Sequence, residues 1–375
     1  MKHETQVLLL EEVLGLKQGN QLFLDEQVTQ NPVNEYLDAE RFEREQQHLF
    51  RTLPSILAHA SEIAEPNSFL RRTTQGLPLL ILRGDDGEAR VFLNVCRHRG
   101  TRLVDDHSGC KKRHSCPYHA WTWNSRGQFV AAPHFEAGFP GTDPTELGLK
   151  QLPSIERHGF IWLMPQDHEI DLSTFLGELD AELAWLDGAN LSHHQTDEQH
   201  RQCNWKLLPE GGLEAYHFRI AHRNTIAKLF NDNLSSYQCL GPHIRSILPR
   251  ASIVELAEQE RSSWNIRDHS NVLYTVFPTS MFLVQSDHVI WIRVEPVGPE
   301  KTELRLMTLK PKETDKPSDY WDANHELTIK TLNEDFDLAE SMQSGMRSGA
   351  NESLRFGRFE GALSKFNETI RQHLV

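Results

Sequence analysis

Two short pairs of residues in the first third of the chain have the spacing of metal ligands. Cys96-x-His98 is followed, after seventeen residues, by Cys116-x-x-His119. Two thiolates and two imidazoles can complete a tetrahedral metal site, which requires the two pairs to converge in space. Each pair stands at the end of a strand-like segment, so the sequence predicts two loops of a β-domain that meet at a metal.

Three interpretations of these pairs are open on spacing alone. The four residues could be unrelated, although two close pairs argue against coincidence. They could hold a structural zinc ion through two cysteine and two histidine ligands. They could also hold a Rieske [2Fe–2S] cluster, in which two cysteines bind one iron and two histidines bind the other.

The length and composition are those of an ordinary globular protein. The chain has 375 residues, enough for two domains with separate cores. No run approaches the roughly 18 consecutive apolar residues that a membrane span needs. The first residues, Met1-Lys2-His3-Glu4, lack the basic region and apolar stretch of a secretory signal. We therefore expect a cytoplasmic protein without a membrane partner.

The chain is acidic and has few cysteines. Its net charge of −14, from 39 basic and 53 acidic residues, argues against nucleic acid as a partner. An acidic surface suits a basic partner protein, but it is also a common route to solubility. An odd number of cysteines does not predict a disulfide framework; the five are Cys96, Cys110, Cys116, Cys203 and Cys239.

Residues 45–165 are expected to form a small all-β domain. Apolar runs at 79–82 and 90–95 flank the turn residues Asp86-Gly87, and an Asp-Gly turn between apolar runs is a strong hairpin signal. Further strand-like segments lie at 121–124 and 160–163. The metal-ligand pairs fall within this β-domain.

Residues 1–44 and 166–375 are assigned to a second domain of mixed character. The segments 272–277, 281–285, 289–294 and 304–309 alternate like strands of an antiparallel sheet with one solvated face. Residues 320–346 predict a long helix that can lie across these strands, as in helix-grip folds. Helical periodicity is also found at 6–16, 39–49, 172–185 and 207–217. The predicted fold class is therefore α+β.

Two histidines five residues apart, His217 and His222, form a second candidate metal site. Neighbours on one helix face are three or four residues apart, so a distorted turn is needed to direct both rings at one metal. The pair is a weak signal by itself in a chain with 20 histidines, since histidines with ordinary hydrogen bonds are common.

The segments NVCRHRG, residues 94–100, and CPYHAW, residues 116–121, resemble the Rieske domain of ring-hydroxylating and related oxygenases. The resemblance implies that the two cysteines of the pairs bind one iron of a [2Fe–2S] cluster and the two histidines bind the other. Respiratory Rieske proteins have a further disulfide-bonding cysteine where this chain has Tyr118. Cys110 is therefore expected to be a free thiol.

A second part of the chain is similar to the mononuclear iron segment of the same family. Asn-Trp-Lys at 204–206 is followed by Glu-Ala-Tyr-His at 214–217 and by His222. The resemblance implies that His217 and His222 bind Fe(II) in a triad of two histidines and one carboxylate, which leaves open positions for O₂.

The carboxylate of this triad is assigned by resemblance to Asp335. The family has a similar Glu-Asp…Glu-Ser-x-Gln stretch in which the aspartate is the ligand, and this chain has that stretch at 334–343. Glu334 and Asp337 are competing candidates. An acidic, solvated helix face without a metal is the alternative interpretation.

The resemblance also implies a role for Glu214. In the family an acidic residue at this position links the Rieske cluster of one subunit to the mononuclear iron of its neighbour. Many members have aspartate there, whereas this chain has glutamate, as some amine-oxidising members do. Such a carboxylate would orient one histidine of each site; a solvated helix glutamate is the alternative. Glu210-Gly211 departs from the family, which often has asparagine in place of Gly211, so an amide donor near the iron is missing.

The resemblance implies a Rieske-type mono- or dioxygenase that receives electrons from a ferredoxin or flavin reductase. No Gly-x-Gly-x-x-Gly run is present, so NAD(P)H is expected to bind the partner rather than this chain. The family's head-to-tail ring implies a homotrimer. The expected substrate is an aromatic compound, as in aromatic hydrocarbon catabolism, or a quaternary amine. Glu214 favours a carnitine- or betaine-like amine.

Aromatic side chains between residues 225 and 310 are candidates for the substrate pocket, because they can stack on an arene or attract a quaternary ammonium. Packing in the sheet core is the more ordinary interpretation of such residues. The candidates are Phe230, Trp264, Tyr274, Phe277, Phe282 and Trp291.

Two functions of other classes remain as alternatives. A Rieske electron-transfer protein without oxygenase activity would need only the β-domain, and it would give no purpose to His217, His222 and Asp335. A binding module stapled by zinc would be colourless, whereas a Rieske protein is red-brown.

Overall fold

The computed structural model describes residues 1–165 and 170–374. Contacts group the chain into two units, one formed by Thr52–Leu172 and the other by Met1–Arg51 with Ser173–Val375. Among the described residues, no helix combines the length and the apolar composition that crossing a bilayer requires.

The unit Thr52–Leu172 is built from short antiparallel strands in three sheets. The strand orders are β10-β5-β4-β3-β6, β11-β12-β2 and β7-β8-β9. Three short helical segments, η2 Ala60–Ile63, α4 Phe135–Gly138 and η3 Pro144–Leu147, connect them. The strands are β2 Ser55–His59, β3 Ser68–Thr74, β4 Leu77–Arg83, β5 Ala89–Leu93, β6 Ser108–Cys110, β7 Arg113–Ser115, β8 Thr122–Asn124, β9 Phe129–Ala131, β10 Gln151–Leu152, β11 Ser154–Arg157 and β12 Phe160–Leu163.

The hairpin predicted at the Asp-Gly turn is β4-β5. Leu82 pairs with Arg90, and Gly87 adopts φ 84°, a left-handed conformation that glycine reaches without a steric penalty. Alternate residues of β4 enter two different cores: Leu80 packs in a cluster that includes both cysteines of the predicted metal site, and Leu79 packs in the other. The strand is therefore buried on both faces, which explains its uninterrupted apolar run.

The second unit is organised around a seven-stranded antiparallel sheet. Its strand order is β13-β19-β18-β17-β16-β15-β14, and a separate two-stranded sheet pairs β1 with β20. The strands are β1 Thr29–Pro32, β13 Leu191–Arg201, β14 Ser236–Leu240, β15 His243–Pro249, β16 Ser270–Val276, β17 Ser280–Val284, β18 Val289–Gly298, β19 Lys301–Pro311 and β20 Ser353–Phe356.

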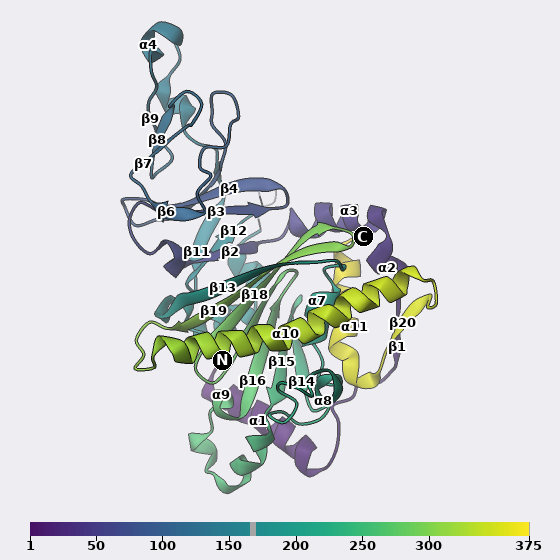
Figure 1. Ribbon diagram of the computed structural model, residues 1–375. Helices are drawn as coiled ribbons and strands as arrows, with labels where there is room; N and C mark the ends of the chain where they lie inside the picture. The colour runs from purple at the N-terminus through teal and green to yellow at the C-terminus, as the bar shows by residue number, and fades with distance from the viewer. Residues whose placement is uncertain (166–169, 375) are drawn as a thin grey trace. The chain divides into compact units, whose positions relative to one another are not determined.

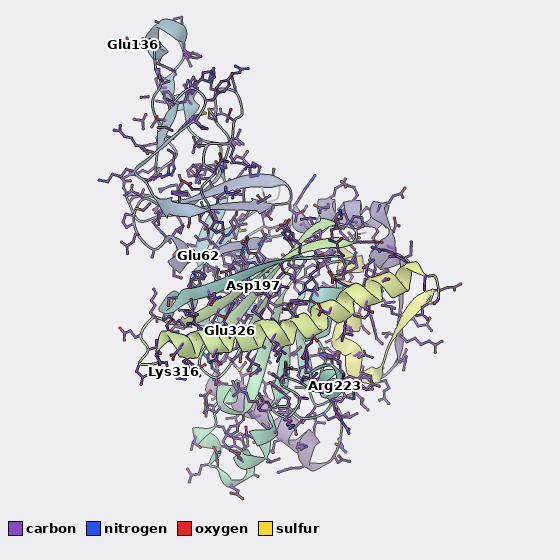
Figure 2. All side chains as sticks on the ribbon, in the orientation of Figure 1. Glu62, Glu136, Asp197, Arg223, Lys316 and Glu326 are labelled. Atoms are coloured by element: carbon purple, nitrogen blue, oxygen red, sulfur yellow. The ribbon has the colours of Figure 1, made fainter. Side chains whose placement is uncertain are left out.

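A 30-residue helix, α10 Ser318–Arg347, crosses one face of this sheet (Figure 1). Its buried residues recur mostly at spacings of three or four, from Trp321 through Thr328 to Phe336, as expected for a helix that packs along one face. Near its start, Lys316, labelled in Figure 2, pairs with Asp287. The remaining helical segments are α1 His3–Gln18, α2 Asn34–Leu37, α3 Ala39–Glu45, η1 Gln46–Phe50, α5 Leu172–Leu176, α6 Leu179–Trp185, η4 Gly188–Asn190, α7 Leu207–Gly212, α8 Phe218–Ala221, η5 Ala251–Glu258, η6 Arg261–Ser263, α9 Ile266–His269, η7 Arg358–Glu360 and α11 Gly361–His373.

The predicted α+β class is confirmed, and the four predicted strands between 272 and 309 correspond to β16, β17, β18 and β19. Two helix predictions were wrong in extent. The helix expected at 172–185 is divided into α5 and α6 at Gly177, which adopts φ 51°. The helix expected at 207–217 ends at Gly212. Strand β13 was missed because its sequence, LSHHQTDEQHR, has no apolar alternation at the edge of the sheet.

Candidate metal centres

The two loops that carry the cysteine–histidine pairs have the same backbone form. In the first loop the Cys96 N–H donates to the carbonyl of Thr101, and the Gly100 N–H donates to the carbonyl of Cys96. In the second loop the Cys116 N–H donates to the carbonyl of Trp121, and the Ala120 N–H donates to the carbonyl of Cys116. Gly100 and Ala120 both have positive φ, so each loop turns sharply behind its two candidate ligands.

The loops bring like donors together. Cys96 and Cys116 are buried, each about 3% exposed, and their thiols are close enough for one to affect the pKa of the other. Burial raises the pKa of the Cys96 thiol, and the Cys116 thiol adds to that rise. The Nδ1 atoms of His98 and His119 lie 3.2 Å apart. One sulfur pair and one nitrogen pair are the donor sets that the two irons of a Rieske cluster need.

His217 and His222 stand at the two ends of a single helical turn. Helix α8 occupies only Phe218–Ala221, and His222 already has φ −93° and ψ 22°, outside the helical region. This distorted turn directs both rings to one side, so that their Nε2 atoms are 3.1 Å apart despite the five-residue spacing. The turn that follows includes Arg223, labelled in Figure 2.

Asp335 reaches the same point from the middle of α10. Its Oδ1 atom lies 3.4 Å from Nε2 of His217 and 3.2 Å from Nε2 of His222. Three ligands at right angles to one another, with bonds of about 2.1 Å, would be about 3.0 Å apart. The three donor atoms therefore have the spacing of one face of an octahedral metal site.

The other acidic candidates lie elsewhere. Glu334 faces the back of the His222 ring, with Oε2 at 2.8 Å from Nδ1, and it accepts a hydrogen bond from the Thr225 hydroxyl at 2.6 Å. Asp337 is on the exposed side of the helix, where it pairs with Arg201 at 2.8 Å. The sequence had offered Glu334 as a competing ligand, whereas its position supports a role in orienting His222.

Glu214 occupies the matching position behind His217. It is 7% exposed, and its Oε1 atom is hydrogen-bonded to Nδ1 of His217. Its Oε2 atom accepts from the backbone N–H groups of Tyr216 and His217. Both histidines thus have Nδ1 engaged by a carboxylate, which leaves both Nε2 atoms directed at the common point.

Hydrogen-bonded acids stabilise positive charge on the two histidines of the triad. Burial lowers the pKa of His217, but hydrogen bonds with Asp335 and Glu214 outweigh burial and raise that pKa to about 10. Burial raises the pKa of Asp335, yet the two histidines hold it below its usual value. A divalent cation placed among the donor atoms would displace this positive charge.

A cavity of about 500 Å³ opens beside the triad. His222, Asp335, Gly211 and Gly212 form part of its wall. A Cβ atom added to Gly211 would lie 3.8 Å from Cβ of Asp335. The position where the family often has asparagine therefore adjoins the predicted iron ligand.

Of the six aromatic pocket candidates, Phe230 lines this cavity. The other five lie outside its wall and are buried in the core, which confirms the more ordinary interpretation for them: Trp264, Tyr274, Phe277, Phe282 and Trp291. The aromatic residues that do line the wall besides Phe230 are Phe218 and Phe336, which were not among the candidates. Phe218 directly follows His217, and Phe336 directly follows Asp335. Their position next to predicted ligands was the signal in the sequence that could have identified them as cavity residues.

Comparisons with known proteins match two domains of the chain to known families. Residues 54–153 match the Rieske [2Fe–2S] domain, and residues 188–375 match the family described as ring hydroxylating alpha subunit, catalytic domain. A glycine betaine monooxygenase oxygenase subunit from Chromohalobacter salexigens is 25% identical over 375 aligned positions, covering 86% of this chain and 80% of the relative. The alpha subunit of a 2-aminobenzenesulfonate 2,3-dioxygenase from Alcaligenes sp. is 33% identical over 197 positions, 51% of this chain and 50% of that one.

The fold has solved counterparts. The crystal structure of a quaternary ammonium Rieske monooxygenase in complex with L-carnitine superposes with a TM-score of 0.80 at 23% identity, covering 93% of this chain and 96% of that chain. A Rieske domain followed by such a catalytic domain defines an oxygenase of the Rieske type, whose cofactors are a Rieske cluster and a mononuclear iron. The chain belongs to the family of ring-hydroxylating alpha subunits. As such it takes electrons from a partner protein and acts on a small molecule.

Proposed function

We propose that this chain hydroxylates a small aromatic compound or quaternary amine at an iron bound by His217, His222 and Asp335. The observation that carries the proposal is the convergence of three donor atoms, 3.1 to 3.4 Å apart, beside a cavity of about 500 Å³. A ferrous ion held by three such ligands keeps open coordination positions for O₂. The cavity places a small molecule next to those positions.

The carboxylates behind the two histidines determine how the rings present themselves. Glu214 accepts from Nδ1 of His217, and Glu334 accepts from Nδ1 of His222, so both rings keep the tautomer whose Nε2 atom is free to bind a metal. Thr225 holds the Glu334 carboxylate in place. These residues act through the ligands, since they do not reach the cavity themselves.

Cys96, His98, Cys116 and His119 are proposed to hold the Rieske cluster. The fit rests on the buried thiol pair and on the imidazole pair, whose Nδ1 atoms are 3.2 Å apart. Trp121 stacks on the His98 ring with 4.8 Å between centroids, which supports its orientation. Bound there, the cluster would accept electrons from a ferredoxin or a flavin reductase that oxidises NAD(P)H.

A homotrimer is part of the proposal. Glu214 sits behind a predicted iron ligand, and a cluster histidine of a neighbouring subunit would be its second partner. His98 and His119 are both partly exposed, so their rings are accessible to another subunit. Sedimentation velocity tests this: a mass close to three times 43.2 kDa is expected, and a monomer would contradict it.

Metal content tests the proposed centres directly. The purified protein should be red-brown and contain about three irons per chain, two in the cluster and one at the triad. His217→Ala should lower the content to two irons while the visible spectrum is retained. His200→Ala is the matched control, because His200 is exposed and pairs only with Glu303 in the part of the chain described, and it should keep three.

An electron-transfer protein would give a different result. It would contain two irons, and His217→Ala would leave that number unchanged. Oxygen uptake coupled to product, measured with a generic reductase and a panel of arenes and betaines, then separates the two substrate classes.

A further inference from the structure

The cavity beside the triad changes character along its length. At the triad end its sheet wall is apolar, with Leu273 of β16 and Met281 of β17 packed near Gly212. Side chains two residues apart on a strand share one face and are displaced by about 7 Å along it. Asn271 lies two residues from Leu273, and Gln285 lies two residues from Leu283. The amides of Asn271 and Gln285 therefore line the cavity just beyond its apolar wall.

Arg250 lies at this amide end. It follows β15, in which Leu248 pairs with Asn271 of the neighbouring strand. Its guanidinium donates to Oδ1 of Asn271 at 2.6 Å and to the backbone carbonyl of Arg267 at 3.2 Å. The amide of Asn271 thus fixes the direction of a half-buried cation in the cavity wall.

The cavity carries an excess of positive charge away from the triad. Apart from the triad residues His222 and Asp335, the charged residues among its described lining are Arg250 and the exposed Lys228. All hydrogen bonds that Arg250 makes within the described chain go to neutral oxygens. The two acids whose charges act on Arg250, Asp268 and Asp287, both lie outside the cavity wall. Asp287 is already engaged by Lys316 and by the hydroxyl of Tyr320.

The dimensions suit a substrate held at both ends. Asn324 and Asp335 both line the cavity from α10, and eleven residues of helix span about 16 Å. Arg250 bonds to Asn271, which lies about 7 Å beyond Leu273 along β16, so Arg250 lies past the apolar wall that adjoins the triad. A planar guanidinium matches the two oxygens of a carboxylate or sulfonate.

Building on the function proposed above, we infer that the substrate carries an anionic group, a carboxylate or a sulfonate, which Arg250 binds at the end of the cavity remote from the triad. Asn271 and Gln285 flank this group, and the apolar wall of Leu273 and Met281 contacts the carbon that is hydroxylated. Unsubstituted hydrocarbons and cations without an acidic group would leave the guanidinium with neutral hydrogen-bond acceptors only.

Calorimetric binding to the iron-loaded protein tests the inference without turnover. The probes are three matched pairs: benzoate and benzamide, benzenesulfonate and benzenesulfonamide, and glycine betaine and its methyl ester. At least one anion should bind about tenfold or more tightly than its partner, because a hydrogen bond to a charged group is worth more than one such factor. The pair that shows the preference identifies whether an aromatic acid or a betaine is the source of the anion.

Variants assign the preference to the residue. Arg250→Gln should abolish the preference, Arg250→Lys should keep part of it, and Arg261→Gln should leave it unchanged. Arg261 is the matched control, since it is exposed, pairs with Glu11 and does not line the cavity. Arg250 also donates to the backbone carbonyls of Arg267 and Asp268, just before β16, so its replacement can lower stability. The melting temperature of each variant is therefore measured beside its titration. The comparison of the probe pairs on the wild-type protein does not depend on any variant.

The inference fails if no anion binds more tightly than its partner, including the case in which no probe binds, or if the preference persists in Arg250→Gln. Its failure is distinct from failure of the oxygenase function. Anion binding without substrate-dependent oxygen uptake would contradict the oxygenase alone. Oxygen uptake with neutral arenes that is indifferent to Arg250→Gln would contradict the inference alone.

Discussion

The Nδ1 atom of His222 lies 2.8 Å from a carboxylate oxygen of Glu334, and that oxygen also accepts a hydrogen bond from Thr225. His217 is held in the same manner by Glu214. Each imidazole of the triad is therefore fixed from behind by a carboxylate, and each Nε2 atom faces Asp335. This arrangement orients the proposed ligands before any metal binds.

Replacing Glu334 should weaken iron binding without affecting the cluster. In Glu334→Ala the His222 ring loses its acceptor, and iron affinity at the triad should fall by about 10- to 100-fold. The measurement is iron content after dialysis against graded concentrations of ferrous ion, with the visible spectrum as the readout for the cluster. Asp337→Ala on the same helix is the control, because Asp337 pairs with Arg201 outside the site. Equal loss in both variants would contradict the proposed role.

Replacing Glu214 should affect turnover more than iron content. Glu214→Gln retains an oxygen that can accept from Nδ1 of His217, so the triad should keep its iron. The negative charge proposed to face a neighbouring subunit is lost, and oxidation of the reduced cluster by O₂ and substrate should slow by about 10- to 100-fold. Stopped-flow absorbance of the cluster measures this rate. Glu214→Asp keeps the charge and should retain more activity than Glu214→Gln; the reverse order would exclude the bridging role.

The buried pair of Glu45 and Lys206 should be essential for stability. Lys206 Nζ lies 2.7 Å from Oε1 of Glu45, both side chains have no solvent exposure, and Trp205 donates to the other oxygen at 2.8 Å. Lys206→Met removes the closer of the two cations that pair with Glu45, the other being Arg41 at 3.3 Å, and should cost about 3 kcal/mol in urea denaturation.

Two further variants test that interpretation. The double variant Glu45→Gln/Lys206→Met should lose less than the sum of the two single losses, because neither charge is left alone. Lys365→Met removes an exposed pair with Glu368 and should change stability by less than about 1 kcal/mol. Additive losses at positions 45 and 206 would show that the pair is not coupled.

Glu210 should make stability fall as the pH rises. Burial raises the pKa of its carboxyl to about 7, against hydrogen bonds from Asn367 and Tyr36 and the charge of Lys206, which lower it. The folded chain then holds this proton more tightly than the unfolded chain, so the contribution is complete below about pH 4.5 and is lost as pH rises to about 7.

Comparison with Glu210→Gln isolates this effect, because the amide keeps an oxygen for both donors. Stability of the variant relative to wild type should increase between about pH 4.5 and 7, by an amount on the order of 3 kcal/mol, and should level off above. Urea midpoints across this range measure the difference, and other titrating groups cancel in the comparison. A difference that does not vary with pH would show that the Glu210 pKa is not raised.

The motif Asn-Trp-Lys illustrates how the sequence can identify a residue without revealing its reason. Its side chains lie away from the triad and join segments distant in the chain: Asn204 donates to the carbonyl of Pro299, and Trp205 and Lys206 both bond to Glu45. The partners are about a hundred residues or more away, and no local pattern points to them. The resemblance identified the motif, and the fold shows that its side chains hold distant segments of the chain together.

The sequence by itself indicated the cysteine–histidine pairs through their spacing, and the α+β class and the long helix through periodicity, because spacing and periodicity are local properties. The triad of His217, His222 and Asp335 came from the resemblance to a family. Tertiary structure decided which acid faces His217 and His222, since Asp335, Glu334 and Asp337 are adjacent in sequence but point in different directions from the helix. It also placed Arg250 in the cavity wall and left five of the six candidate aromatic residues outside that wall. Side chains from β15, β16, β17 and α10 meet there only after the sheet has formed.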